Sequence, residues 1–127
     1  MSDSCNPGDR QYHAEHTWIM SADSEYVVGI TAHAQEALGD VVYVQTPEVG
    51  VRVSLGVACG VIESVKTAAD LHAPASGVVT AVNPALADHP ELLNSDPYGA
   101  WIFRMKLAGA SELTALMDAA AYGKAFG

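Results

Sequence analysis

Positively charged residues are scarce in this chain. It has 127 residues, with six lysines and arginines against fifteen aspartates and glutamates, and a formal net charge of −9. Because binding to phosphates needs a basic surface, this balance argues against nucleic acid as a partner. An acidic protein is suited to docking on basic patches of other proteins, although the same charge also serves solubility alone. Composition leaves both interpretations open.

Cysteine and long hydrophobic runs are also lacking. Cys5 and Cys59 have no metal-binding spacing and make no disulfide framework, and Cys59 is predicted to be a small buried residue in an apolar run. No run reaches membrane-spanning length, and residues 1–11 lack the pattern of a signal or transit peptide. We therefore expect no membrane partner and a bacterial-type cytoplasmic location, with a mature organellar protein as the alternative.

The histidines form no recognisable catalytic or metal-binding pattern. His13 and His16 are three residues apart in a predicted strand, which places them on opposite faces. His33 and His72 have no visible catalytic partner, and no cluster has the spacing of metal ligands. Ser64 lies near a lysine but has no identifiable base. We expect no metal site and no enzymatic activity.

Short β-type segments dominate what is present. Half of the residues are hydrophobic, which is enough to bury the core of a single small domain. Valine-rich and aromatic runs between turn signals predict strands at 12–20, 25–30, 40–45, 51–55, 56–65, 71–82 and 100–107. This pattern predicts a mainly β sandwich or barrel over residues 12–127, preceded by a flexible tail at 1–11.

Helical signals are short and lie between or after these strands. Thr31 is placed to cap a helix that Gly39 ends. Pro90 divides 85–94 into two short helical turns. A C-terminal helix is predicted to begin at a Ser111 cap. One face of that helix would carry Leu113, Leu116, Met117 and Ala120.

Lys66 is the strongest candidate for a functional residue. It is one of three lysines and stands in a short polar link between two β-type runs, which predicts a tight turn with Lys66 at or near its tip. Taken alone, an exposed lysine in a turn is usually only solvated. The neighbouring sequence changes that balance.

The motif around Lys66 resembles the H-protein family of the glycine cleavage system, whose members carry covalently bound lipoic acid. Residues 63–67 read Glu-Ser-Val-Lys-Thr, and Asp70, Pro74 and the Ser76-Gly77 pair follow at the family's spacing. Further similarity lies at 29–42, 47–50, 82–83, 90–94, 97–98 and Trp101, and it extends over about residues 12–122. Biotin carriers usually have methionine on both sides of the lysine, whereas Val65 and Thr67 stand here.

The resemblance implies a flattened β-barrel or sandwich of the lipoyl-domain (barrel-sandwich hybrid) type, with lipoate attached to Lys66. Such a carrier takes an aminomethyl group from glycine decarboxylase (P protein) to the aminomethyltransferase (T protein), and dihydrolipoamide dehydrogenase (L protein) reoxidises the arm. It has no catalysis of its own, and a monomer is expected. A lipoate ligase or octanoyltransferase is expected to recognise the residues around Lys66, namely Glu63, Ser64, Val65, Thr67 and Asp70.

Two departures from the family keep other functions open. The family has a glutamate where this chain has Thr17, and Glu15 would point to the other face of a regular strand. The loop at 97–101 is also one residue shorter between its tyrosine and tryptophan. Both changes concern the cleft that shelters the loaded arm. The alternatives are a related lipoyl carrier that serves lipoyl transfer or another redox system, and an unmodified interaction module.

Overall fold

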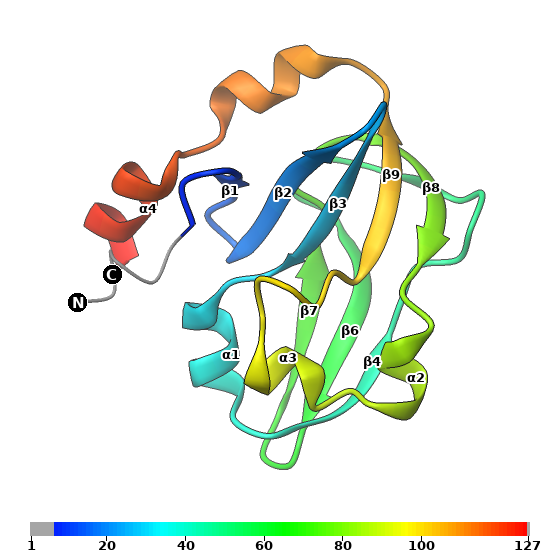
Figure 1. Ribbon diagram of the computed structural model, residues 1–127, viewed down its shortest axis with the longest axis vertical. Helices are drawn as coiled ribbons and strands as arrows, with labels where there is room; N and C mark the ends of the chain where they lie inside the picture. The colour runs from blue at the N-terminus through cyan, green and yellow to red at the C-terminus, as the bar shows by residue number, and fades with distance from the viewer. Residues whose placement is uncertain (1–6, 127) are drawn as a thin grey trace.

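The computed structural model describes residues 7–126 and contains two antiparallel β-sheets packed against each other (Figure 1). The larger sheet has the strand order β1-β2-β3-β9-β8-β5, and the smaller sheet has the order β4-β6-β7. The strands are β1 (Gln11–Tyr12), β2 (Thr17–Ala22), β3 (Glu25–Ile30), β4 (Val41–Gln45), β5 (Arg52–Val53), β6 (Ala58–Ser64), β7 (Ala68–His72), β8 (Gly77–Val82) and β9 (Phe103–Leu107). The expected mainly β fold is confirmed.

The main core lies between the two sheets, where alternate residues of the strands face inward. Val28 and Phe103 come from the larger sheet, and Ile62 and Leu71 come from the smaller sheet. All four side chains are almost completely buried, as expected for side chains that alternate across a pleated strand. A second buried cluster, formed by Tyr12, Trp18, Val27 and Tyr122, lies where the C-terminal helix packs on the larger sheet.

Short helices connect and flank the sheets. They are α1 (Ala32–Leu38), α2 (Ala85–Asp88), α3 (Leu92–Ser95), the 3-10 helix η2 (Ala110–Ala115) and α4 (Ala119–Phe126). The predicted cap of α1 is confirmed, because the Thr31 hydroxyl accepts a hydrogen bond from the Ala34 N–H. Gly39 ends that helix with a positive φ of 78°. The two helical turns predicted around Pro90 are α2 and α3.

The first predicted strand, 12–20, is wrong as a single element. The chain turns between β1 and β2, so that β1 folds back onto β2 and Tyr12 pairs with Trp18. The turn closes with hydrogen bonds from the His13 N–H to the Thr17 carbonyl and from the His16 N–H to the His13 carbonyl. His16 has a φ of 70°, a left-handed conformation that sequence periodicity does not reveal.

The predicted strand 71–82 consists of two strands in different sheets. β7 begins at Ala68, and residues 73–76 cross to the larger sheet, where β8 begins at Gly77. The crossing is held by Glu112, whose carboxylate accepts hydrogen bonds from the N–H and the hydroxyl of Ser76. A long-range contact of this kind leaves no periodic signal in the local sequence.

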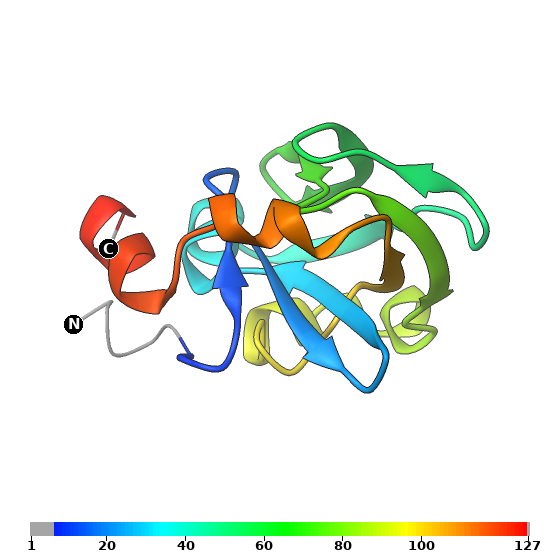
Figure 2. The ribbon, with the colours of Figure 1, turned by 90° about the horizontal axis from the view of Figure 1, so that it is seen from above.

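The predicted C-terminal helix is wrong in its start and its continuity. Gly109, not Ser111, precedes η2, and Leu116 is extended with φ −85° and ψ 160°. Met117 then forms an isolated β-bridge with Tyr12 through two backbone hydrogen bonds. The Asp118 side chain accepts a hydrogen bond from the Ala121 N–H, at the start of α4. Seen from above, α4 stands beside β1 at one end of the molecule (Figure 2).

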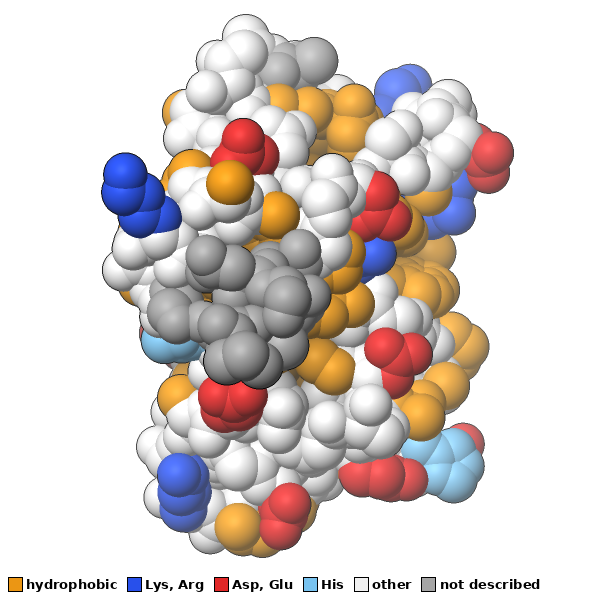
Figure 3. All heavy atoms as spheres, turned by 60° about the vertical axis from the view of Figure 1, so that its left-hand side comes forward, with side chains coloured by type: hydrophobic (Ala, Val, Ile, Leu, Met, Phe, Trp, Pro, Cys, Tyr) orange, Lys and Arg blue, Asp and Glu red, His pale blue; other side chains and the backbone are white. Residues whose placement is uncertain are grey.

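The remaining sequence predictions concern the tail, Cys59 and the membrane. Residues 1–6, with Cys5, lie outside the described residues, whereas the Arg10 and Gln11 side chains hydrogen-bond to the Tyr98 and Leu113 carbonyls. Cys59 is partly buried, and desolvation raises the pKa of its thiol to about 11. Between residues 7 and 126, no helix is both long and apolar enough to span a membrane. Acidic side chains are spread over the face seen in Figure 3.

Candidate functional site

Lys66 lies in the turn between β6 and β7, which projects at the bottom of Figure 1. The strands pair with Glu63 opposite Ala68, and the Ser64 N–H donates to the Thr67 carbonyl at 2.8 Å. The Ser64 hydroxyl accepts from the N–H groups of Lys66 and Thr67 at 3.3 and 3.1 Å and donates to the Thr67 carbonyl. One side chain therefore holds the whole turn, while Lys66 and Val65 remain exposed.

The base of the turn is fixed to the end of α1 and to α3. The Val65 N–H donates to the Asp40 carbonyl. The Asn94 side chain donates to the Gly39 carbonyl at 2.7 Å and accepts from the Val41 N–H at 2.8 Å. A Cβ atom placed on Gly39 would lie 3.4 Å from Cε of Lys66. The lysine stem therefore runs past the C-terminal end of α1, on a rigidly held support.

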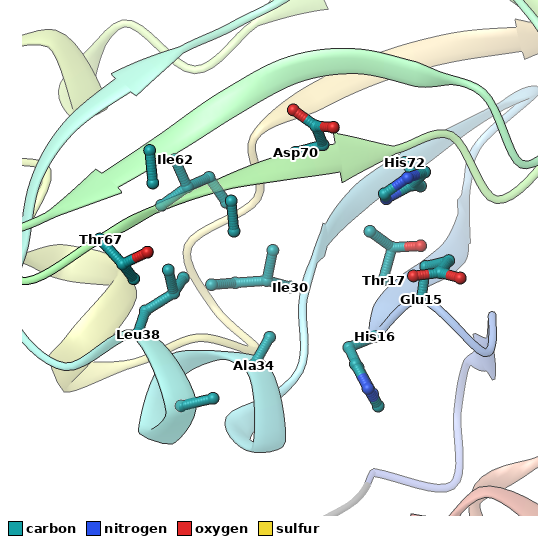
Figure 4. Close-up of a pocket in the computed structure, with 13 residues that line it drawn as sticks. Glu15, His16, Thr17, Ile30, Ala34, Leu38, Ile62, Thr67, Asp70 and His72 are labelled. Carbon is teal, nitrogen blue, oxygen red and sulfur yellow. The ribbon is translucent and has the colours of Figure 1, made fainter.

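A cavity of about 330 Å³ opens beside this turn (Figure 4). Its floor is apolar, with side chains from β3, α1 and β6, and its rim carries carboxylates and imidazoles. It is lined by Glu15, His16, Thr17, Ile30, Ala34, Ala37, Leu38, Ile62, Thr67, Ala68, Ala69, Asp70 and His72. A volume of this order is in the range of small-molecule sites.

The predicted site residues divide between this cavity and the outer surface. Thr67 and Asp70 line the cavity. Glu63 and Val65 are exposed and are not among its lining residues, and Val65 is 71% exposed. Ser64 is a structural residue of the turn, a role that the sequence analysis missed. A serine side chain that hydrogen-bonds backbone groups two and three residues ahead is a known turn signal, and it could have been recognised.

The structure places Glu15 on the cavity wall, and this corrects the expectation that it points to the opposite face. The expectation was wrong even for a regular strand, in which residues 15 and 17 share a face, and in the structure residues 13–16 form a turn. Glu15 and Thr17 therefore both line the cavity, across from Asp70 (Figure 4). Thr17 is 1% exposed, and its hydroxyl has no hydrogen-bond partner among the described residues. A buried polar group without a partner is unfavourable unless it meets another polar group.

His16 and His33 lie in contact with each other, which the sequence analysis did not predict. The His16 and His33 rings stack with centroids 4.3 Å apart, and the Tyr122 hydroxyl lies 2.6 Å from Nδ1 of His16. Burial lowers the pKa of His16, and the neighbouring His33 lowers it further. Within residues 7–126, no group of three or more His, Cys, Asp and Glu side chains is arranged to bind a metal ion.

The short loop at 97–101 packs beneath α1. The Tyr98 hydroxyl accepts a hydrogen bond from the Ala32 N–H at 3.0 Å, and the Trp18 indole donates to the Pro97 carbonyl at 3.1 Å. None of the loop's residues lines the cavity. The loop therefore supports the first turn of α1 and leaves the cavity wall to other elements.

Two packed sheets, an exposed lysine on a rigid β-turn and a cavity beside that turn are features of carrier domains that bear a prosthetic group on a lysine arm. Comparisons with known proteins identify the family. The sequence model of the glycine cleavage H-protein family matches residues 10–126. The chain therefore belongs to the glycine cleavage H-protein family, whose members carry lipoate on a lysine.

Individual relatives cover nearly the whole chain. It is 56% identical over 118 residues to the glycine cleavage system H proteins of Escherichia coli K12 and Salmonella paratyphi B, across 91% of this chain and 92% of each relative. Its structure is similar to the crystal structure of a glycine cleavage system H protein from Mycobacterium marinum, with a TM-score of 0.86 and 45% identity. That match covers 94% of this chain and 97% of the other. The family and fold inferred from the Lys66 motif are confirmed.

Proposed function

We propose that this protein carries lipoate on Lys66 and works as the lipoyl carrier of a glycine cleavage system. The observation that carries the proposal is the position of Lys66, on a turn held by Ser64 and beside a cavity suited to a small molecule. The bound lipoyl group supplies a dithiolane that accepts the aminomethyl group of glycine, passes it to a folate-dependent enzyme and is reoxidised. The protein itself positions and protects the lipoyl arm, and it contributes no catalytic residue.

The residues of the cavity fit such an arm. Ile30, Leu38 and Ile62 offer an apolar floor to a hydrocarbon chain. Glu15 and Asp70 place carboxylates at the rim, where they attract a protonated amine. Thr17 also lines the cavity, and its buried hydroxyl has no hydrogen-bond partner among the described residues. Glu15 thus supplies the negative charge that the family places at the position of Thr17, and we propose that the loaded arm is sheltered here from water.

The surface around Lys66 is suited to several protein partners in turn. The partners we propose are the P, T and L proteins, together with the lipoate ligase or octanoyltransferase that modifies Lys66. Exposed Glu63 and Val65 flank the turn, and exposed Tyr43 pairs with Glu63 across the sheet. An enzyme that approaches the Lys66 turn can recognise this combination of charged and apolar surface. A monomer and a bacterial-type cytoplasmic location stay predictions.

The attachment site is tested by incubating the folded protein with a lipoate ligase, lipoate and ATP, and measuring intact mass with peptide mapping. We expect a single lipoyl addition on Lys66. Lys66→Arg should remain unmodified, whereas Lys106→Arg, which changes another exposed lysine on β9, should be modified normally. An unmodified wild-type chain beside a modified control carrier would contradict the proposal.

The pathway is tested separately with the lipoylated protein. Added to glycine decarboxylase and glycine, it should stimulate the exchange of carbon dioxide with the glycine carboxyl group. Normal lipoylation without this stimulation would instead support a lipoyl carrier that serves lipoyl transfer or another redox system.

A further inference from the structure

The Tyr122 hydroxyl joins three elements that are far apart in the sequence. It lies 2.6 Å from Nδ1 of His16, in the turn before β2, and 2.8 Å from Oγ1 of Thr31, the cap of α1. Tyr122 itself belongs to α4 and is 1% exposed. It does not line the cavity, but His16 does. A contact from the C-terminal helix thus reaches the cavity through one imidazole ring.

One arrangement of protons satisfies every hydroxyl in this chain of contacts. The Thr31 oxygen accepts the Ala34 N–H, so its own proton is free to be donated to the Tyr122 oxygen. The Tyr122 hydroxyl then donates to an unprotonated Nδ1 of His16. This orientation agrees with the lowered pKa of His16, because burial and the adjacent His33 both favour the neutral ring.

His16 occupies a backbone conformation that needs such support. Its φ of 70° lies in the left-handed region, which is uncommon for residues other than glycine. The backbone contributes two hydrogen bonds, from the His16 N–H to the His13 carbonyl and from the Thr31 N–H to the His16 carbonyl. Phe126 packs its ring edge-on against His16 at 4.8 Å. The side chain of His16 is therefore held by Tyr122 and Phe126 of α4 and by the ring of His33.

The conformation of His16 determines what its two neighbours contribute to the cavity. Glu15 precedes it and Thr17 follows it, and both line the cavity on the wall opposite Asp70 (Figure 4). In a regular strand, residues 15 and 17 would share a face that residue 16 does not. Here all three line one cavity, and this depends on the turn.

We propose that Tyr122 is a positioning residue for the arm cavity: through His16 it holds the turn that presents Glu15 and Thr17 to the lysine arm. The inference rests on the proposed function, in which this cavity shelters the loaded arm. It assigns to the C-terminal helix a role in the arm's protection, although that helix has no residue in the cavity.

The test compares Tyr122→Phe with Tyr12→Phe. The control is matched, because Tyr12 stacks on Tyr122 with centroids 4.9 Å apart, is equally buried and gives its hydroxyl to the Pro7 carbonyl. The first readout uses the unlipoylated protein and needs no activity: amide hydrogen exchange at residues 15–17 and at Thr31, with the NMR titration of the His16 ring. We expect faster exchange and a raised His16 pKa in Tyr122→Phe only.

The second readout is the lifetime of the aminomethyl-loaded arm without partner enzymes. In its decay, water adds to the aminomethyl carbon as the carbon–sulfur bond breaks, giving the thiol, formaldehyde and ammonium. We expect Tyr122→Phe to shorten the lifetime by about tenfold, which corresponds to about 1.4 kcal/mol and is typical of one lost hydrogen bond. The rate of lipoylation at Lys66 should be unchanged in both variants.

The outcomes separate the inference from the function on which it rests. If Tyr122→Phe behaves as Tyr12→Phe in both readouts, the positioning role is wrong while the carrier function stands. If the wild-type arm decays as fast as the same group on a free lipoyl peptide, the cavity gives no shelter and the inference falls with that part of the proposed function. A loss of thermal stability shared by both variants, without the other changes, contradicts positioning.

Discussion

Gly39 stands at the residue where α1 ends and the lysine stem passes. Its φ of 78° and ψ of −150° lie in a region that is close to exclusive to glycine. A side chain at this position would also contact the stem of Lys66, with Cβ 3.4 Å from Cε. One glycine thus both ends the helix and leaves space for the Lys66 side chain.

Gly39→Ala is expected to destabilise the protein by about 1–3 kcal/mol, because alanine has to adopt this strained backbone conformation. Denaturant unfolding measures the stability, and the initial rate of lipoylation reports the displaced lysine stem. Gly109→Ala is the control, since Gly109 has an extended backbone with φ −169° and nothing within 4 Å of an added Cβ. Equal stability of the two variants would contradict the role of Gly39.

At this scale, sequence alone predicted Lys66 and the Thr31 cap but not the cavity wall. Thr31 was predictable because a cap acts within three residues of itself. The sequence-based placement of Glu15 was wrong because residues 15 and 17 of a strand share a face. The left-handed turn at His16 was missed because residues 13–16 contain no glycine or asparagine. The turn is held instead by Tyr122, a contact 106 residues away in the chain. Contacts between residues so far apart in the sequence cannot be predicted from local sequence patterns.

At the scale of elements, the Lys66 hairpin depends on α3, a helix of one turn. Asn94 in α3 bonds the backbone on both sides of Asp40, at Gly39 and Val41. Asp40 in turn accepts the Val65 N–H through its carbonyl. The contacts that support the Lys66 turn therefore run from α3 through Asp40 and the start of β4 to Val65. A one-turn helix has little intrinsic stability. The hydrogen bonds of Asn94 to the backbone at the start of β4 are therefore what gives α3 its structural role.

Asn94→Ala is expected to lower the free energy of unfolding by about 2 kcal/mol, because it leaves a partly buried carbonyl and N–H without partners. Hydrogen exchange should also accelerate at Val41 and Val65. Ser95→Ala changes the next residue of the same helix, which is exposed and makes only a 3.4 Å contact with the Leu92 carbonyl. If both variants unfold at the same denaturant concentration, Asn94 does not support the hairpin.

The type of most elements was predictable from the sequence, and the errors in their predicted boundaries share one cause. β3, α1 and β4 lie where periodicity and caps placed them, since their signals are local. The strand at 71–82 and the C-terminal helix were drawn too long. In both, a distant partner interrupts the element: Glu112 at Ser76, and Tyr12 at Met117.

For the whole molecule, the lowered pKa values of two partly buried histidines make the free energy of unfolding depend on pH in mild acid. The pKa values of His13 and His16 lie below their ordinary 6.5, chiefly because of burial. The charged neighbour of both is Glu15. The other titratable groups facing them are His72 for His13, and His33, His13 and Tyr122 for His16. The unfolded chain therefore takes up protons first as the pH falls.

The free energy of unfolding should accordingly be highest above about pH 7 and fall as the pH drops through 6.5, until the folded-state pKa values are reached. Urea unfolding at a series of pH values measures this slope. His13→Gln should make the slope shallower, because it removes one of the two groups whose pKa is lowered in the folded state. A slope of the opposite sign would show that relief of the −9 net charge outweighs the histidines.

The unpaired hydroxyl of Thr17 has a consequence for how the arm is released. If a docked arm gives this group a partner, the docked arm also stabilises the fold. Thermodynamic linkage requires that the free energy gained by docking equals the stability added to the folded protein. An arm that swings out leaves a less stable protein behind. A partner enzyme must then supply at least that difference through its own contacts, so the cargo is exposed mainly where an acceptor is already bound.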